Sequence, residues 1–233
     1  MHPLLPALQK GLGGLGLVLS VDQQIQLLDY MDLIAKWTKV YNLTAVRDAN
    51  EMLTHHLLDS LAVIAPLRRE LARLSLSSSG RAEISAAQAE AKPASSKFSL
   101  LDVGAGAGLP GIVIAIVCPE VSVTCVDTVA KKAAFIQQVA ATLKLPNLKG
   151  LHARVESLTQ PYDVVCSRAF ASLIDFTTWS QSALAEHGVW MAMKGKHPDQ
   201  ELAVLPESVR VFHVEQLQVP GLDAERCIIW MRG

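Results

Sequence analysis

Glycines at alternate positions follow an acidic residue in the run Leu100-Leu101-Asp102-Val103-Gly104-Ala105-Gly106-Ala107-Gly108. A buried strand leads into these glycines, and an apolar helix follows with Pro110 in a position that suits its first turn. Glycine lets a ligand approach the backbone closely, and a helix N-terminus offers free N–H groups. The run therefore predicts a ligand-binding loop, with a tight strand–helix turn that holds no ligand as the alternative.

Two ligands fit this loop. Residues 106–111 match G-x-G-x-x-G, the fingerprint of dinucleotide binding. The first glycine after the strand is Gly104, however, and Asp102 precedes it, which resembles motif I of S-adenosylmethionine (SAM) methyltransferases. We expect Asp102 to orient the turn and to help hold the methionine end of the cofactor, with Gly104, Gly106 and Gly108 beside it.

A second acidic residue, Asp127, ends the next expected strand. A carboxylate at that place can accept hydrogen bonds from a ribose diol, which occurs in NAD and in SAM alike. The alternative is an N-cap for the helix expected over 130–143. Val155 and Glu156 follow the third strand, where such folds place the adenine, although Glu156 is equally explained as a solvated acid.

These residues need a scaffold of alternating strands and helices. Such alternation predicts an α/β fold, with a mostly parallel sheet of seven strands covered on both faces. The expected strands are 98–103, 121–126, 148–153, 162–167, 189–194, 211–218 and 226–231, and the last two are joined by a hairpin connection over 219–223. The expected helices among them are 110–118, 130–143, 170–185 and 198–205.

The chain divides by composition into three parts. Residues 1–74 predict a helical extension, with helices after Asp22, over 52–64 up to Pro66, and over 67–74. Residues 75–97 are mostly Ser and Ala, which bury too little apolar surface to offset their ordering entropy, so we expect a flexible insertion with a weak helical piece at 84–91. Residues 98–233 form the ligand-binding core.

The composition excludes several classes of protein. A formal net charge of -1 gives no general nucleic-acid signal, so any basic patch has to be local. The four cysteines are scattered without a metal-binding spacing, which disfavours structural zinc and disulfides and fits a cytoplasmic location. No apolar run is long enough to cross a membrane. Cys166 lies in an apolar strand and is predicted to be a core residue rather than a nucleophile.

The chain resembles the bacterial 16S rRNA (guanine-N7)-methyltransferases, also called glucose-inhibited division protein B, over about residues 20–232 apart from the Ser/Ala insertion. Motif I alone is shared by many methyltransferases, whereas the runs around 41–44 and 167–172 are much more specific. The matching runs are Trp37 to Asp48, His55-His56-Leu57-Leu58-Asp59-Ser60, Asp102 to Gly111, Ser167-Arg168-Ala169-Phe170-Ala171-Ser172-Leu173, Met193-Lys194-Gly195, Leu217 to Pro220 and Asp223 to Arg226.

This resemblance implies a SAM-dependent methyltransferase (Rossmann-like) fold with an N-terminal helical extension, and methyl transfer from SAM to N7 of a guanine in small-subunit rRNA. The family's cofactor positions correspond here to Gly104, Leu109, Val155, Glu156 and Arg168. Guanine N7 carries a lone pair and no proton, so we expect no general base, only placement of N7 in line with the sulfonium. Relatives often carry Thr or Pro between the glycines, where this chain has Ala.

Substrate contacts are expected near the carboxyl ends of the strands. Arg168 suits the cofactor carboxylate or a phosphate, with an ion pair to Glu156 or Asp127 as the alternative. Phe170 suits stacking on an unstacked guanine, with a core position at a helix start as the alternative. The other substrate-binding candidates are Arg47, His56, Lys194 and Lys196, followed by His55, Arg226, Lys131 and Lys132, of which the last two are also explained as solvated.

The partner that the resemblance implies is 16S rRNA or a small-subunit assembly intermediate, and we expect a monomer. Three other functions remain open at this level. They are a SAM methyltransferase with another RNA or a small-molecule substrate, an NAD-linked dehydrogenase, and a non-catalytic rRNA-binding assembly factor.

Overall fold

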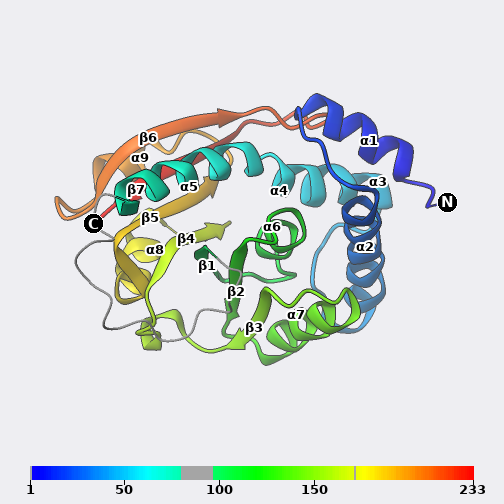
Figure 1. Cartoon of the computed structure of the whole chain (residues 1–233), viewed down its shortest axis with the longest axis horizontal. Helices are drawn as coiled ribbons and strands as arrows, with labels where there is room; N and C mark the ends of the chain where they lie inside the picture. Colours follow the sequence, from blue (N-terminus) through cyan, green and yellow to red (C-terminus); the bar gives the residue numbers. More distant parts are fainter. Residues whose placement is uncertain (1, 80–96, 171) are drawn as a thin grey trace.

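A computed structural model describes residues 2–79, 97–170 and 172–233. Its centre is a seven-stranded sheet in the order β3-β2-β1-β4-β5-β7-β6 (Figure 1). Strands β1 to β5 pair in parallel, and β7 runs antiparallel to both β5 and β6. The strands are β1 (Phe98–Val103), β2 (Val121–Asp127), β3 (Leu148–His152), β4 (Tyr162–Arg168), β5 (Leu184–Lys194), β6 (Arg210–Leu217) and β7 (Arg226–Arg232).

This order confirms the predicted mostly parallel sheet and fixes where a ligand can bind. The chain passes from β1 outward to β2 and β3, and then returns to the other side of β1 to form β4 and β5. The crevice outside the carboxyl ends of β1 and β4 is therefore the topological switch point, where open α/β sheets bind their ligands. The glycine loop leaves β1 at this point.

The N-terminal part is helical, as predicted, with different boundaries. Its elements are α1 (Leu5–Gly14), α2 (Val21–Tyr41), α3 (Ala49–Met52), the π-helix η1 (Leu53–Leu58), α4 (Asp59–Leu61) and α5 (Ile64–Ser79). A capping box starts α2, because Ser20 Oγ accepts the Gln23 N–H and the Gln23 side chain accepts the Ser20 N–H.

Two predicted helix limits were wrong. Pro66 does not end a helix, because it lies in the first turn of α5, where its missing N–H has no intrahelical partner to lose. Helix α5 also continues through Ser79 and so includes the start of the stretch predicted to be a flexible insertion. The helical piece predicted at 84–91 lies outside the described residues.

The remaining helices are α6 (Gly111–Val117), α7 (Ala130–Thr142), α8 (Leu173–Ser180) and α9 (Asp199–Ala203), with 3-10 turns η2 (Val155–Ser157) and η3 (Gln181–Ala183). The helix predicted over 170–185 is shorter than expected at both ends. Ser172 caps it by accepting the Asp175 N–H, and after Ser180 the chain continues as the 3-10 turn η3. The buried Ser180 hydroxyl donates to the Phe176 carbonyl and accepts the Trp190 indole N–H from β5.

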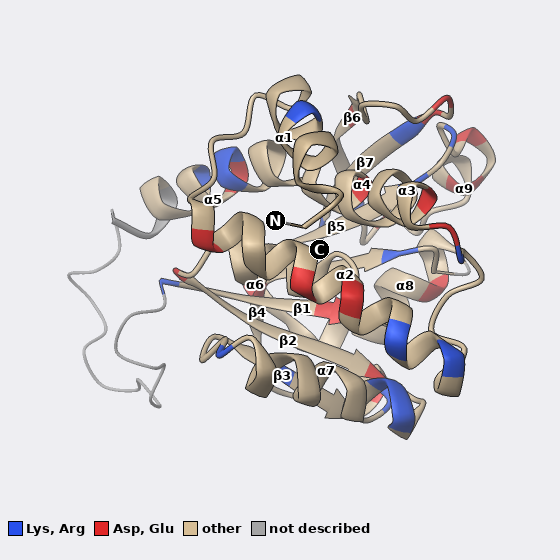
Figure 2. Cartoon of the chain, turned by 90° about the vertical axis from the view of Figure 1, so that its right-hand side faces the viewer, with Lys and Arg blue, Asp and Glu red and all other residues tan. Residues whose placement is uncertain are grey.

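Alternate strand residues build two apolar clusters, one on each face of the sheet. Leu100 belongs to the first cluster, together with α1, α2, α5, α6 and α7, whereas Leu101 belongs to the second, which includes α8. Helix α2 lies against α6 and α7 and thus covers the helical layer of the first face (Figure 2). Within the described residues, no helix is long and apolar enough to span a membrane.

Candidate functional site

The glycine loop has a backbone shape that side chains disfavour. Gly104, Gly106 and Gly108 have φ of 66°, 60° and 92°. The N–H groups of Gly104 and Ala105 donate to the Val126 carbonyl at 2.9 and 3.2 Å, which ties the loop to β2. A Cβ on Gly108 would lie 2.3 Å from Ile112 Cδ1, so this glycine serves close packing. It borders neither of the hollows described below, and its contact with the cofactor stays a prediction. Gly104 and Gly106 border open space.

The acid before the loop is completely buried. Asp102 Oδ2 accepts the Gly111 N–H at 2.8 Å, which confirms that this residue orients the turn. Its Oδ1 has no hydrogen-bond partner among the described residues, and burial raises its pKa to about 7. The expectation that Asp102 also holds the cofactor's methionine end is not supported, because its side chain borders neither of the hollows described below.

Asp127 connects the loop to the turn after β2. Its Oδ2 accepts the Gly106 N–H at 2.9 Å, and its Oδ1 accepts the Val129 N–H at 2.8 Å. The helix N-cap considered for Asp127 is in fact Val129. Lys132, considered as a solvated residue, has its Nζ 3.7 Å from the same carboxylate. Asp127 therefore holds the glycine loop in place and also borders one of the hollows.

Two hollows meet at Gly104. The aromatic hollow, of about 380 Å³, is bordered by Gly104, Asp127, Val155, Glu156, Phe170 and Trp179, among others. The arginine hollow, of about 530 Å³, is bordered by Gly104, Gly106, Leu109, Asp59, Arg168 and Arg226, among others. Ala169, with φ of 60°, lies between Arg168 at the end of β4 and Phe170. Arg168 borders the arginine hollow, whereas Phe170 borders the aromatic hollow.

The aromatic hollow has a wall of two rings. Phe170 packs edge-on against Trp179 at 5.6 Å and lies close to Gly104, where an added Cβ would be 3.6 Å from its ring. Phe170 precedes α8 and is half buried, so it is not the helix-start core residue considered as the alternative. Trp179 was missed by the sequence analysis, although its spacing of three residues from Phe176 would have placed both on one side of α8.

The arginine hollow contains a buried ion-pair cluster that the sequence analysis did not predict. Asp59, only 2% exposed, accepts Arg168 Nη1 at 3.0 Å and Arg226 Nε at 2.8 Å. Arg168 Nη1 also donates to the His55 carbonyl, 3.2 Å away in the π-helix η1. The ion pairs considered for Arg168, with Glu156 or Asp127, are therefore replaced by one with Asp59.

His56 reaches the same hollow from η1. Its Nε2 is hydrogen-bonded to the Thr44 hydroxyl, and its Nδ1 has no partner among the described residues. Burial and the neighbouring Arg168 charge lower the pKa of His56 below 6.5, so the ring is neutral at physiological pH. The ring therefore borders the hollow without adding positive charge to it.

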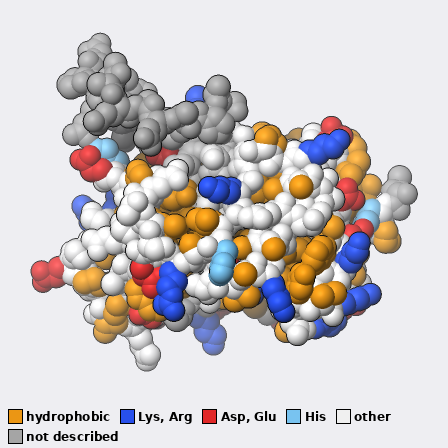
Figure 3. All heavy atoms as spheres, turned by 90° about the horizontal axis from the view of Figure 1, so that it is seen from below, with side chains coloured by type: hydrophobic (Ala, Val, Ile, Leu, Met, Phe, Trp, Pro, Cys, Tyr) orange, Lys and Arg blue, Asp and Glu red, His pale blue; other side chains and the backbone are white. Residues whose placement is uncertain are grey.

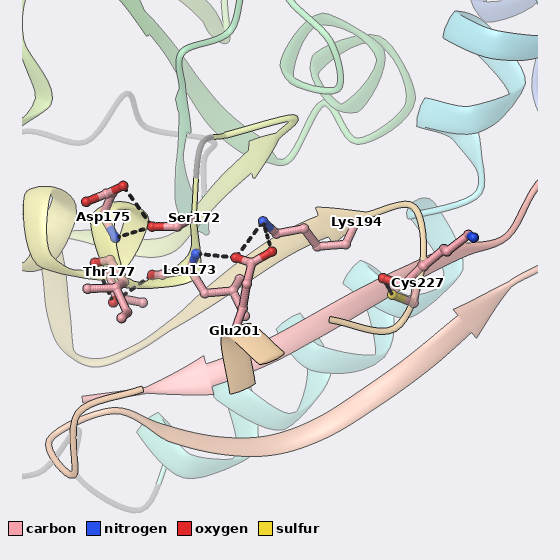
Figure 4. Close-up of polar contacts among 9 residues, drawn as sticks. Ser172, Leu173, Asp175, Thr177, Lys194, Glu201 and Cys227 are labelled. Atoms are coloured by element: carbon pink, nitrogen blue, oxygen red, sulfur yellow. Dashed lines mark hydrogen bonds and ion pairs between the residues drawn. The ribbon is translucent and has the colours of Figure 1, made fainter. Parts of the chain in front are cut away.

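Two of the three other predicted substrate contacts lie elsewhere. Lys194 borders the arginine hollow, but its Nζ is 2.9 Å from both carboxylate oxygens of Glu201, which also accepts the Leu173 N–H at the start of α8 (Figure 4). Arg47 and Lys196 are exposed and border neither hollow, so their contact with the substrate stays a prediction. Arg47 donates to the Asn42 side chain.

Cysteine chemistry is not available at the site. Cys166 is completely buried in β4, as predicted for a core residue, and burial raises its thiol pKa well above 9. Among the described residues, no group of three or more His, Cys, Asp or Glu side chains could hold a metal ion.

Comparison with known proteins gives a consistent result. A family model described as rRNA small subunit methyltransferase G matches residues 23–74 and 84–229. Proteins named Ribosomal RNA small subunit methyltransferase G are similar to this chain: one from a Polaromonas species is 66% identical over 97% of this chain and 92% of its own length. Those from Albidiferax ferrireducens and Methylibium petroleiphilum are 63% and 55% identical, over 100% and 98% of this chain and 98% and 94% of their own lengths.

Proposed function

The chain belongs to the rRNA small subunit methyltransferase G family, and from that premise we propose that it transfers a methyl group from SAM to N7 of a guanine in 16S rRNA. The observation that carries this proposal is the pair of hollows that meet at a glycine-rich loop on the switch point of the sheet. One hollow has the size and aromatic wall for a nucleoside, and the other has cations for an amino-acid carboxylate and for RNA.

The residues present fit the cofactor. An added Cβ on Gly106 would find no protein atom nearer than 3.9 Å, so the loop leaves a cradle that side chains would otherwise fill. We assign the adenosyl group to the aromatic hollow, with Asp127 at the ribose and Val155 and Glu156 at the adenine. We assign the methionine end to the arginine hollow, with Gly104, Gly106 and Leu109 beneath it and Arg168 near the carboxylate. When bound, SAM supplies an electrophilic methyl group on a sulfonium.

The chain's own residues then have to place the guanine rather than activate it. N7 has an available lone pair and no proton, so an in-line displacement needs no general base. No residue is therefore assigned that role. Phe170 borders the aromatic hollow, and we assign its face to the adenosyl group rather than to the guanine. We assign the neutral His56 ring, held by its hydrogen bond with Thr44, to the wall of the hollow where the guanine would lie.

The electrostatics of the arginine hollow suit this reaction. Methylation at N7 leaves the purine positively charged, so a strong uncompensated cation near N7 would oppose it. His56 is held neutral by its lowered pKa, Lys194 is paired with Glu201, and Asp59 balances one of two arginine charges. The positive charge that remains is enough for an anionic substrate group.

We also propose 16S rRNA, or a small-subunit assembly intermediate, as the partner of a monomeric cytoplasmic enzyme. With a net charge of -1, the chain cannot rely on its overall charge to bind RNA. Lys and Arg side chains are scattered over the face shown in Figure 3 rather than gathered into one patch. Affinity must then come from a few local contacts and will depend on salt through those contacts.

The test is methyl transfer from labelled SAM to small-subunit RNA and to 30S particles, followed by identification of the modified base. N7-methylguanine in the RNA is the expected product. Label only in protein or small molecules, or NAD binding by calorimetry without SAM binding, would contradict the proposal. RNA binding with SAM affinity but no turnover would instead indicate a non-catalytic assembly factor.

A further inference from the structure

The feature that the proposed function leaves unexplained is the sharing of one buried carboxylate by two arginines. Asp59 lies at the start of α4, Arg168 at the end of β4, and Arg226 at the start of β7. Three segments that are far apart in sequence thus meet at one ion-pair cluster. Burying a carboxylate costs free energy unless its charge is paired and hydrogen-bonded, and here both oxygens are.

Each guanidinium keeps donors that the fold does not use. Arg226 donates through Nε to Asp59 and through Nη1 to the Glu225 carbonyl at 2.8 Å. Arg168 donates only through Nη1. Among the described residues, neither Nη2 has an acceptor, while the side chains remain 22% and 24% exposed for Arg168 and Arg226 respectively. Both border the arginine hollow.

The two arginines lie at different distances from the glycine loop. In the sheet order, Arg168 is on β4 beside β1, whereas Arg226 is on β7, three strands from β1, or roughly 14 Å at the usual strand spacing. Gly195 lies next to Arg226, where an added Cβ would be 4.0 Å from Nη1, so no side chain covers that guanidinium from this position. The two guanidinium groups thus meet at Asp59 from different strands, Arg168 from the strand beside the glycine loop and Arg226 from a strand farther from it.

We propose that Arg226 binds a phosphate of the RNA substrate, and that Asp59 is the positioning residue that holds Arg226 and Arg168 toward the hollow. The inference rests on the proposed function, because it assumes an RNA substrate. The cluster carries two positive charges and one negative charge, which leaves one net positive charge for a phosphate. The planar guanidinium, with one edge fixed by Asp59, retains N–H donors for phosphate oxygens.

The experiment compares Arg226→Gln and Arg226→Lys with a matched control at the other end of β7. There, Arg232 Nη2 pairs at 2.9 Å with Glu70, a carboxylate that is 3% exposed and also pairs with Arg73. Arg232→Gln and Glu70→Gln therefore remove the same kind of ion pair away from the site. For each variant we would measure the Kd of SAM, kcat and KM for small-subunit RNA, and RNA binding against salt concentration.

Arg226→Gln is expected to raise the KM for RNA about tenfold, to leave the Kd of SAM unchanged, and to reduce the slope of log K against log salt by about 0.7 to 1. Arg226→Lys is expected to keep the wild-type salt slope and to have a KM for RNA between those of the wild type and Arg226→Gln. Arg232→Gln and Glu70→Gln are expected to change neither the KM for RNA nor the salt slope. A purely structural role for Arg226 would not alter the salt slope, so an unchanged slope in Arg226→Gln overturns the inference, as does a raised Kd of SAM with an unchanged KM for RNA.

Asp59→Asn tests the positioning role. It is expected to weaken SAM binding and to raise the KM for RNA together, and the double variant with Arg226→Gln is expected to have an RNA defect smaller than the sum of the two. If the RNA defect of the double variant equals the sum of the two single defects, Asp59 does not act by positioning Arg226. If wild-type protein transfers no methyl group to small-subunit RNA, the proposed function itself fails; transfer by the wild type with no effect of Arg226→Gln removes only this inference.

Discussion

Replacing Asp102 with Asn tests whether the acid before the glycine loop is held protonated by the fold. The carboxyl group is completely buried, so it makes no hydrogen bond to solvent, and its Oδ2 accepts the Gly111 N–H. Asparagine has nearly the same shape and can keep that hydrogen bond through its own oxygen. The substitution therefore removes the titration with little change in packing.

The expected effect follows from the raised pKa of Asp102, which moves from 3.8 to about 7. Between these two values the native state keeps a proton that the unfolded chain has already lost, so the wild type loses stability as pH rises. From pH 5 to pH 8 this loss amounts to about 3 kcal/mol for one group with such a shift. Asp102→Asn does not titrate, so its stability relative to wild type should rise by that amount over the same interval.

Urea unfolding of both proteins at pH 5, 6, 7 and 8 measures this difference directly, with Trp fluorescence as the signal. Ser60→Ala is the matched control, because Ser60 is also completely buried and cannot titrate, so its difference from wild type should be constant across the series. A constant difference between Asp102→Asn and wild type across all four pH values would refute the reasoning, since Asp102 would then be ionised or protonated equally in both states.

Three further predictions concern Tyr30 and Gly106, which shape the glycine loop, and Ser20, which caps α2. Tyr30→Phe removes the 2.7 Å hydrogen bond from the buried Tyr30 hydroxyl to the Ala107 carbonyl, and should cost about 1–3 kcal/mol in urea unfolding and raise the Kd of SAM; an unchanged Kd would show that the loop does not depend on this bond. Gly106→Ala should fold, because the added Cβ has space and φ of 60° strains alanine by about 1–3 kcal/mol, but it should weaken SAM binding at least tenfold in calorimetry because that Cβ would enter the cradle assigned to SAM; wild-type affinity would contradict this assignment. Ser20→Ala should lower stability by about 1 kcal/mol through loss of the Gln23 cap, with SAM affinity unchanged as the internal control.

The sheet could be predicted because the sequence patterns that indicate its strands are local. Apolar runs that alternate with helical periodicity, together with the glycine loop, were sufficient for a mostly parallel seven-stranded sheet and for the positions of Gly104 and Asp127 at the ends of its strands, whereas the order of the strands came from the structure. The limits of α8 were harder to predict, because the apolar pattern continues through the 3-10 turn η3, and contacts such as the hydrogen bond from Trp190 to Ser180 exist only in the folded chain.

The arginine hollow could not be read from the sequence for the same reason. Asp59 gives no local indication of its role, since its two partners are separated from it by more than a hundred residues. Lys194 and Lys196 look equivalent in sequence, yet the first is neutralised by Glu201 and the second lies outside the hollow. Charge pairing of this kind is a property of tertiary structure.

The contacts between the N-terminal helices and the loop have a consequence for any attempt to divide the protein. Tyr30 on α2 supports the glycine loop, and Thr44, His56 and Asp59 supply one side of the arginine hollow. A fragment that begins at β1 would keep the seven strands but lose part of the wall against which RNA is expected to dock. Engineers who wish to give this enzyme a new target therefore cannot exchange the first seventy residues as a removable recognition module; they must redesign both parts together.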